Sequence, residues 1–331
     1  MPSIVHAEEL LYTYFKRQDA NDEARIPELA ARIADAGLWL TPTLSTFGNI
    51  VEQWGRQAAV DSALAAPLAR YLHPDLIAYW TGNNPYTGRT QGPAWVKGAY
   101  RFQFPLVKQL HEAGVRLLTG TDTPLPVLVP GFSLYDEIAV LVEAGLSRFD
   151  AIQAATRNPG LYIAELVDPA ERFGTVAVGH RADLILLDDN PLDDLAHLKQ
   201  KRGVMARGRW FPQAALDQLL ADLATSYAAM KETSEPPEPT ITLSEAELRK
   251  FVGVYESSAT SNDVIVVLKE GVLEGIAGEK TFPLAPVSPV RFRIDGMPGK
   301  NYLEFLPQDD AVNQVRVEIQ GITPVLMDRK D

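Results

Sequence analysis

Apolar and polar positions in the first half of the chain repeat one pattern twice. Residues 25–36 carry apolar side chains at helical spacing, a glycine ends the predicted helix, and residues 38–40 form a short buried strand. Residues 104–112 are again predicted as a helix, and residues 115–118 as the strand after the next glycine. This order of helix, glycine, strand and polar loop is typical of parallel β/α units.

A long stretch, residues 46–100, separates these two units and is rich in aromatic residues, proline, glycine and asparagine. Stretches of this length inside a compact domain usually form functional lids or hold helices of their own. Its tryptophans and tyrosines are compatible with a substrate-facing wall, but simple packing within a helical insertion is the favoured interpretation.

A further helix is predicted to begin after Ser147, whose hydroxyl suits an N-cap. Its inner face is expected to hold Phe149, Ile152 and Ala155. Pro159 is expected to end this helix, because a residue that precedes proline disfavours helical geometry.

Short strands dominate the second half of the chain. Two are predicted at residues 173–176 and 182–187, and a third at residues 203–210. An amphipathic helix is predicted over residues 213–230. The proline-rich, charged residues 233–240 then read as the clearest linker in the chain.

Beyond this linker, Ser244 and Glu247 have the spacing of a capping box at a helix start. Short strands then alternate with turn residues, at positions 264–269, 273–277, 291–294, 302–306, 314–320 and 323–327. This pattern predicts a small antiparallel β domain. The expected division of the chain is therefore residues 1–169, 170–212, 213–240 and 241–331.

Composition narrows the classes of function. The chain has 331 residues, enough for two domains, with 46% hydrophobic and 22% charged residues. Its net charge of −12 argues against nucleic acid or an anionic membrane as a partner. The absence of cysteine excludes disulfides, thiolate metal sites and a cysteine nucleophile. No membrane-spanning run or cleavable signal is found, so a cytoplasmic or periplasmic location stays open.

Two polar residues follow predicted strands directly. Asp122 comes after the strand at residues 115–118, and His6 comes after the apolar residues 3–5. In a parallel β/α barrel, functional residues lie at these carboxyl ends of the strands. Imidazole and carboxylate together suit a divalent metal such as zinc, although an aspartate here is also a common turn residue and a histidine a common surface residue.

The sequence gives only weak evidence for any other kind of catalytic site. His111 is interpreted as a helix C-terminal residue, His180 and His197 as structural, and His73 as a minor candidate for substrate contact. There is no Gly-x-Ser-x-Gly motif, no phosphate-binding glycine loop, and no His-x-His or His-Glu-x-x-His pair.

Several segments, taken in order, resemble the amidohydrolase superfamily. They are residues 111–123, which contain Thr119-Gly120-Thr121-Asp122, and residues 130–137, 141–147, 154–159, 173–184, 190–194 and 208–210. Pro42-Thr43-Leu44 is similar to the imidazolonepropionase- and prolidase-like branch. The resemblance implies an α/β fold, a partial TIM (β/α)8 barrel made of strands six to eight, with a small β-sandwich segment at residues 170–212.

The resemblance also implies the roles of the two polar residues. His6 matches a metal-binding histidine at the end of strand six, and Asp122 matches the aspartate of strand eight, a metal ligand and proton shuttle. The implied reaction is hydrolysis of a carbon–nitrogen bond in a small amide-type substrate by metal-activated water. The implied cofactor is a divalent metal, with zinc the first candidate.

The sequence departs from the family pattern in one important way. The His-x-His pair of strand one, the ligand of strand four and the histidine of strand five have no counterpart in it. We therefore expect the C-terminal portion of a longer enzyme, which would be inactive as this chain alone. The alternative is a non-catalytic binding or accessory subunit, and a homo-oligomer stays open.

The last part of the chain carries a resemblance of its own. Residues 243–256 are similar to the opening of lipocalin-like β domains that are appended to some serine hydrolases and amidohydrolases. This similarity is also the only support for a serine hydrolase, and the missing serine motif speaks against that reading.

Overall fold

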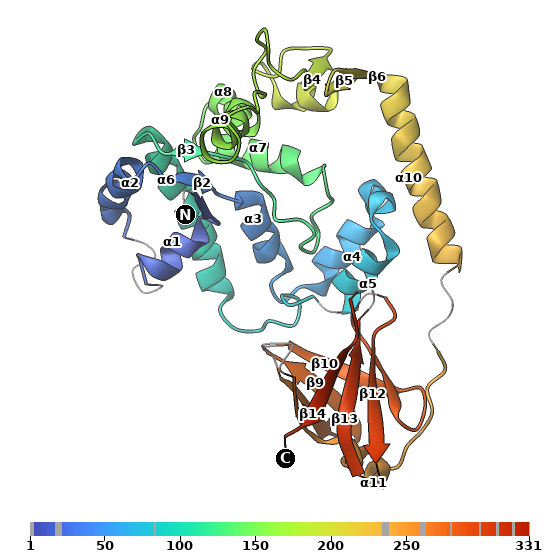
Figure 1. The fold of residues 1–331 in the computed structure, drawn as a ribbon. Coiled ribbons are helices and arrows are strands. Elements are labelled where there is room, and N and C mark those ends of the chain that lie inside the picture. Colours follow the sequence, from blue (N-terminus) through green and yellow to red (C-terminus); the bar gives the residue numbers. More distant parts are fainter. Residues whose placement is uncertain are drawn as a thin grey trace. The chain divides into compact units, whose positions relative to one another are not determined.

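A computed structural model describes residues 3–16, 22–82, 84–233, 238–257, 263–278, 280–297, 299–308, 311–319 and 322–330. The chain divides into two compact units (Figure 1). The first comprises residues 1–72 and 85–227, and the second comprises residues 73–84 and 228–331. The finer four-part division stays a prediction, and residues 234–237 of the expected linker lie outside the described residues.

Three parallel strands form the centre of the first unit. They are β1 (Ser3–Val5), β2 (Trp39–Thr41) and β3 (Arg116–Leu117), hydrogen-bonded in the order β1-β2-β3. Leu40 of β2 is in register with Ile4 of β1 and with Leu117 of β3. The parallel strand and helix pattern expected from the sequence is therefore confirmed, and all three strands run toward the same edge of the sheet.

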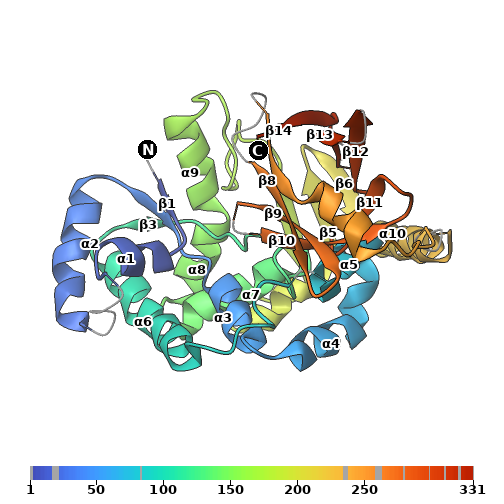
Figure 2. The ribbon, with the colours of Figure 1, turned by 90° about the horizontal axis from the view of Figure 1, so that it is seen from below.

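Helices connect these strands. The elements between β1 and β2 are α1 (Glu8–Thr13), η1 (Glu23–Arg25) and α2 (Ile26–Asp35). Between β2 and β3 the first unit holds α3 (Leu44–Gln53), α4 (Gln57–Ala65), η2 (Pro67–Tyr71) and α6 (Pro93–Glu112). The stretch at residues 46–100 is thus mainly a helical insertion. Figure 2 shows α2 and α6 beside each other, and Leu106 of α6 is fully buried in the core that includes Leu40 and Leu117.

Three helices follow β3: α7 (Ser133–Glu143), α8 (Arg148–Ala155) and α9 (Arg157–Leu166). The predicted cap is confirmed, because the Ser147 hydroxyl accepts a hydrogen bond from the Asp150 N–H. The predicted inner face was wrong in one position, since Phe149 is 58% exposed and alanines face the core instead. Pro159 lies in the first turn of α9 rather than ending α8, because a first-turn residue needs no N–H donor.

The small second sheet is antiparallel and consists of β4 (Leu184–Leu187), β5 (Lys201–Ala206) and β6 (Arg209–Pro212). The strand expected at residues 173–176 is not formed. The strand expected at residues 203–210 is two strands, because Arg207 and Gly208 both adopt positive φ and turn the chain.

A long helix, α10 (Gln213–Thr233), follows this sheet. It matches the helix expected over residues 213–230, but none of its side chains within residues 213–230 is buried. No helix in the described part of the chain, α10 included, has the length and apolar character needed to cross a membrane.

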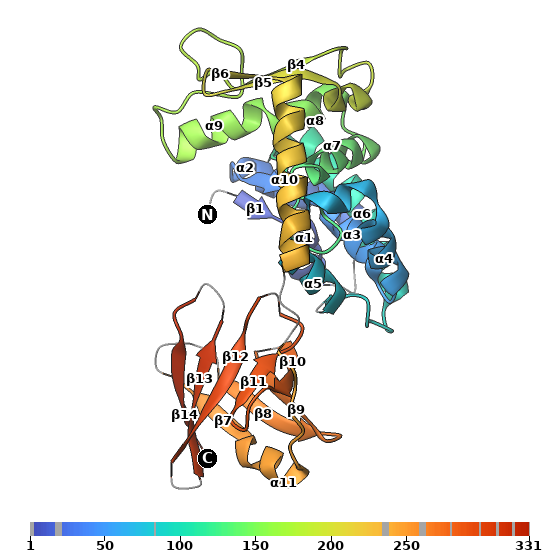
Figure 3. The same ribbon diagram turned by 90° about the vertical axis from the view of Figure 1, so that its right-hand side faces the viewer.

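The second unit contains a closed antiparallel barrel, drawn in Figures 1 and 3 with α11 (Glu245–Leu248) at one end. Its strands are β7 (Gly253–Glu256), β8 (Val264–Lys269), β9 (Val272–Ala277), β10 (Lys280–Pro286), β11 (Arg291–Ile294), β12 (Tyr302–Gln308), β13 (Ala311–Glu318) and β14 (Val325–Arg329). Each strand pairs with its sequence neighbours, and β14 pairs with β7 to close the barrel. This unit also contains α5 (Pro74–Gly82) and η4 (Arg249–Phe251). The predicted capping box of Ser244 and Glu247 is confirmed.

Two barrel strands, β7 and β10, had not been predicted. Strand β10 contains Pro283, which reads as a strand breaker because it lacks an N–H donor. The structure accommodates it because the pairing of β10 with β11 begins one residue later, at Leu284. The similarity of this unit to lipocalin-like domains stays a prediction.

Aromatic side chains fill the core of the barrel. The Phe305 ring lies 4.6 Å from Phe251, 5.5 Å from Phe292 and 5.6 Å from Tyr255, measured between ring centroids. All four residues are less than 5% exposed. Edge-to-face and tilted aromatic pairs of this kind stabilise a core beyond simple area burial.

We predict that Phe305→Ala destabilises the barrel by about 3 to 5 kcal/mol, because it removes a fully buried ring and leaves a cavity among Phe251, Tyr255 and Phe292. Urea unfolding followed by near-ultraviolet circular dichroism measures the loss. Leu326→Ala, on a barrel strand but 47% exposed, is the control and should change stability by less than about 0.5 kcal/mol. Equal effects of both substitutions would contradict the proposed role of the aromatic core.

Candidate functional site

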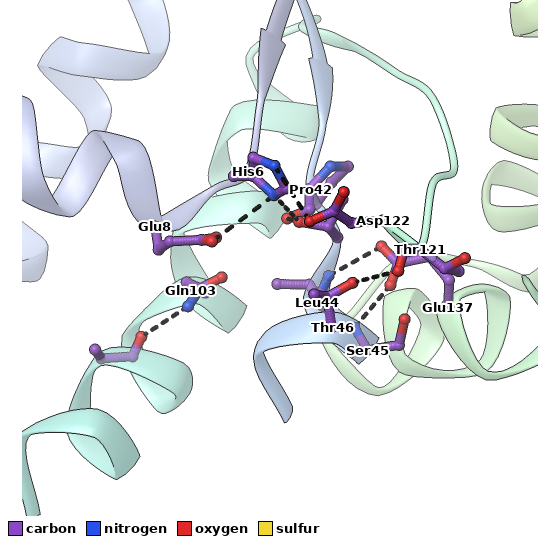
Figure 4. Close-up of polar contacts among 12 residues, drawn as sticks. His6, Glu8, Pro42, Leu44, Ser45, Thr46, Gln103, Thr121, Asp122 and Glu137 are labelled. Carbon is purple, nitrogen blue, oxygen red and sulfur yellow. Dashed lines mark hydrogen bonds and ion pairs between the residues drawn. The ribbon is translucent and has the colours of Figure 1, made fainter. Parts of the chain in front are cut away.

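The structure brings His6 and Asp122 together, as expected from their positions after strands. His6 follows β1 directly, and its backbone N–H donates to the Thr41 carbonyl at 2.9 Å. Asp122 lies in the loop that follows β3. The Nε2 atom of His6 is 3.8 Å from Oδ2 of Asp122, and the two side chains are 29% and 48% exposed (Figure 4). Both groups therefore remain accessible to a ligand.

Residues with left-handed backbone geometry carry this site. His6, Thr43 and Asp122 have φ of 71°, 54° and 47°, and each comes shortly after one of the three parallel strands. Such geometry costs a non-glycine residue about 1–3 kcal/mol and persists where the surroundings enforce it. Its occurrence after all three strands shows that the surroundings enforce unusual backbone geometry along this edge of the sheet.

The loop that holds Asp122 is anchored through the preceding residues. The Thr121 carbonyl accepts a hydrogen bond from the Thr46 hydroxyl at 2.8 Å, and the Thr121 hydroxyl is 3.0 Å from the Ser133 hydroxyl. A Cβ atom at residue 120 would lie 2.7 Å from the Thr41 methyl carbon, so any larger residue would force one of the two segments to shift. These contacts restrain the backbone immediately before Asp122.

The other nitrogen of the His6 ring faces two groups. Nδ1 lies 2.8 Å from the Thr43 hydroxyl oxygen and 3.8 Å from Oε1 of Glu8 (Figure 4 shows Glu8 on the side of the ring away from Asp122). Burial raises the pKa of Glu8 to about 7. Its Oε2 atom is buried and has no hydrogen-bond partner among the described residues.

Glu137 holds the turn between β2 and α3. Its carboxylate, fully buried on α7, accepts hydrogen bonds from the N–H groups of Leu44 at 3.1 Å and Ser45 at 2.7 Å. It thereby satisfies the free donors at the start of α3, where a negative charge also suits the helix dipole. Burial raises the pKa of Glu137 to about 7, although these hydrogen bonds oppose the shift.

The remaining histidines have partners of their own. His111, in the last turn of α6, is 3.5 Å from Oδ2 of Asp150, which agrees with its structural interpretation. The other three each have Nδ1 within hydrogen-bond distance of a nearby residue in the sequence: His73 with Asp75, His180 with Thr175, and His197 with Asn190.

Sequence reasoning gave no role at the site to Glu8, Glu137 or Thr43, although Thr43 entered it through the motif Pro42-Thr43-Leu44. Glu8 is in the first turn of α1, where an acidic residue is ordinary. Glu137 carried a detectable signal, because helical spacing places it on the same face of α7 as Ser133 and Leu141, both buried. A charged residue on the buried face of a predicted helix indicates that a polar partner is buried with it.

The side-chain types of His6 and Asp122 are compatible with a divalent metal. A neutral imidazole nitrogen and a carboxylate oxygen are ligands that zinc and similar ions accept. Within the part of the chain that the structure describes, however, no three His, Asp or Glu side chains gather closely enough to hold a metal. Among the described residues, His6 and Asp122 are therefore two candidate ligands at this edge of the sheet, whereas zinc sites use three or four protein ligands.

Comparison with known proteins adds evidence from outside the chain. The sequence model of the Amidohydrolase family matches residues 22–211, a span that includes Asp122 but not His6. An ochratoxinase from Aspergillus niger is 34% identical over 94 residues, which are 28% of this chain and 18% of the ochratoxinase.

Two solved structures are also similar. A bottromycin amidohydrolase has 24% identity and a TM-score of 0.48, over 69% of this chain and 49% of that one. A putative prolidase from Bifidobacterium longum has 29% identity and a TM-score of 0.34, over 57% and 40% of the two chains. The chain thus spans less than half the length of each of these three proteins.

We predict that Glu137 makes stability depend on pH. Because its pKa is higher in the folded protein than in the unfolded chain, the unfolded chain releases the proton first as pH rises from about 4.5 to about 7. The free energy of unfolding should fall over this range, and it should fall less in Glu137→Gln. Urea unfolding of both proteins at several pH values measures the difference, in which the shared contribution of Glu8 cancels. Parallel pH profiles would show that Glu137 is not the source.

Proposed function

Because the chain belongs to the amidohydrolase family, we propose that its chemistry is the metal-dependent hydrolysis of carbon–nitrogen bonds in small amide-type substrates. One observation carries the proposal. His6 and Asp122, predicted independently from two distant segments, approach to 3.8 Å at the carboxyl edge of one parallel sheet. That edge is where β/α proteins place their reactive groups.

Nε2 of His6 and the carboxylate of Asp122 are the groups that would hold the metal, with zinc the first candidate. A divalent ion there supplies Lewis-acid polarisation and lowers the pKa of water. With only these two described protein ligands, we expect metal binding to be weak and this chain alone to show no turnover.

Asp122 is the group that moves the proton. Its half-exposed carboxylate can accept the proton of a water molecule that attacks the amide carbon. It can then donate this proton to the amide nitrogen as the carbon–nitrogen bond breaks. The carbon gains the hydroxyl group of the water, and the leaving amine nitrogen gains the transferred proton.

The family match supports an amide-type substrate. Acyl-amino acids, proline dipeptides and cyclic amides are the substrates to test. Neither nucleic acid nor a membrane is proposed as a partner, and self-association remains open.

For the fold, we propose that β1, β2 and β3 correspond to strands six, seven and eight of a (β/α)8 barrel. Their parallel order and the helices between them support this assignment. The sheet β4–β6 would then belong to the β-sandwich segment of the family.

A second candidate is a non-catalytic binding or accessory protein. It is favoured by the finding that no third metal-ligating side chain joins the pair within the described residues. The two candidates differ in one measurable property, since only the first needs metal at His6 and Asp122.

We predict that Zn²⁺ binds the purified chain at one site and that His6→Ala and Asp122→Ala each weaken this binding at least about tenfold, or about 1.4 kcal/mol. Isothermal titration calorimetry measures the affinity. His111→Ala is a matched control, because His111 and Asp150 form a similar pair at 3.5 Å away from the strand ends. It should leave the affinity unchanged.

The outcomes separate the two candidates. Zinc binding that depends on His6 and Asp122 supports the hydrolase site, and hydrolysis of any tested amide would contradict only the expected inactivity of this chain. Absence of binding, or equal loss in His111→Ala, would favour the non-catalytic protein.

A further inference from the structure

The His6 ring is bonded through one nitrogen and open at the other. Nδ1 is 2.8 Å from the Thr43 hydroxyl oxygen, within hydrogen-bond distance. Nε2 is 3.8 Å from Asp122, too far for a hydrogen bond. The two nitrogens therefore have different surroundings, and a neutral ring has one proton to place between them.

The Thr43 hydroxyl determines where that proton goes. Its oxygen also lies 2.7 Å from the Pro42 carbonyl, which can only accept a hydrogen bond. The single hydroxyl proton is therefore donated to Pro42. The hydroxyl oxygen is then available only as an acceptor toward Nδ1 of His6, so this nitrogen must carry the ring proton.

We propose that Thr43 is a positioning residue that sets the tautomer of His6, with the proton on Nδ1 and the lone pair of Nε2 directed toward Asp122. This inference rests on the proposed metal-holding role of the His6 and Asp122 pair. Metal-binding histidines are commonly oriented in this way, by a group that accepts a hydrogen bond from the second ring nitrogen.

Thr43 is itself held firmly in place. It is 2% exposed and has a left-handed backbone, which is rare for a β-branched residue. The N–H groups of the next two residues, Leu44 and Ser45, are bound by the buried carboxylate of Glu137. The restrained backbone after Thr43 keeps the hydroxyl near His6, and it explains why a strained residue is tolerated here.

One other group faces Nδ1. Oε1 of Glu8 lies at 3.8 Å, beyond hydrogen-bond distance. Glu8 is therefore the competing explanation for the tautomer, and a substitution of Thr43 alone separates the two.

The test is NMR of ¹⁵N-histidine-labelled protein without metal, at about pH 8.5, because the neutral imidazole is the form that has two tautomers. The protonated and unprotonated ring nitrogens differ in chemical shift, and His6→Gln assigns the signals. We expect the Nδ1–H tautomer in the unsubstituted protein and in Thr43→Ser, and a mixture of tautomers in Thr43→Val. An Nε2–H tautomer in the unsubstituted protein, or no change in Thr43→Val, would overturn the proposal.

Zinc titration provides the second readout. Thr43→Val should lower Zn²⁺ affinity by about 10- to 100-fold, while Thr43→Ser, which retains the hydroxyl, should stay close to the unsubstituted protein. If the unsubstituted chain binds no zinc, the proposed function is contradicted. The NMR data then decide the tautomer proposal independently. If Thr43→Val does not fold, the NMR measurement of the tautomer in the unsubstituted protein still tests the proposal.

Discussion

The buried carboxylate of Glu137 joins α7 to the turn between β2 and α3, and the candidate site depends on this contact. Leu44 and Ser45 donate their N–H groups to it, so the turn that contains Thr43 is fixed by a residue of α7. Thr43 in turn contacts the His6 ring. A charge that is costly to bury is tolerated because it satisfies helix donors that would otherwise be unpaired.

The same principle operates around Asp122. Thr121 is held by hydroxyl groups of α3 and α7, and Gly120 allows its loop to pass close to β2. The side chains that would do chemistry are thus partly exposed, while the groups that position them are buried. Such a division is expected where reactive groups must keep a defined geometry and still meet a ligand.

The two units have different sources of stability. The first unit relies on a parallel sheet covered by helices, with polar contacts concentrated at the carboxyl edge of its strands. The barrel of the second unit is closed by the pairing of β14 with β7 and filled by Phe251, Phe292 and Phe305. Closure removes exposed strand edges, and the aromatic core occupies the interior.

The sequence by itself determined the parallel β/α pattern, the caps at Ser147 and Ser244, most barrel strands, and the candidacy of His6 and Asp122. These features depend on local periodicity and on residue types that act over a few positions. Only the tertiary structure decided that Thr43 and Glu8 face the same nitrogen of His6 and that Glu137 binds the start of α3. Those contacts join segments up to 93 positions apart, and no local pattern encodes which buried groups will meet.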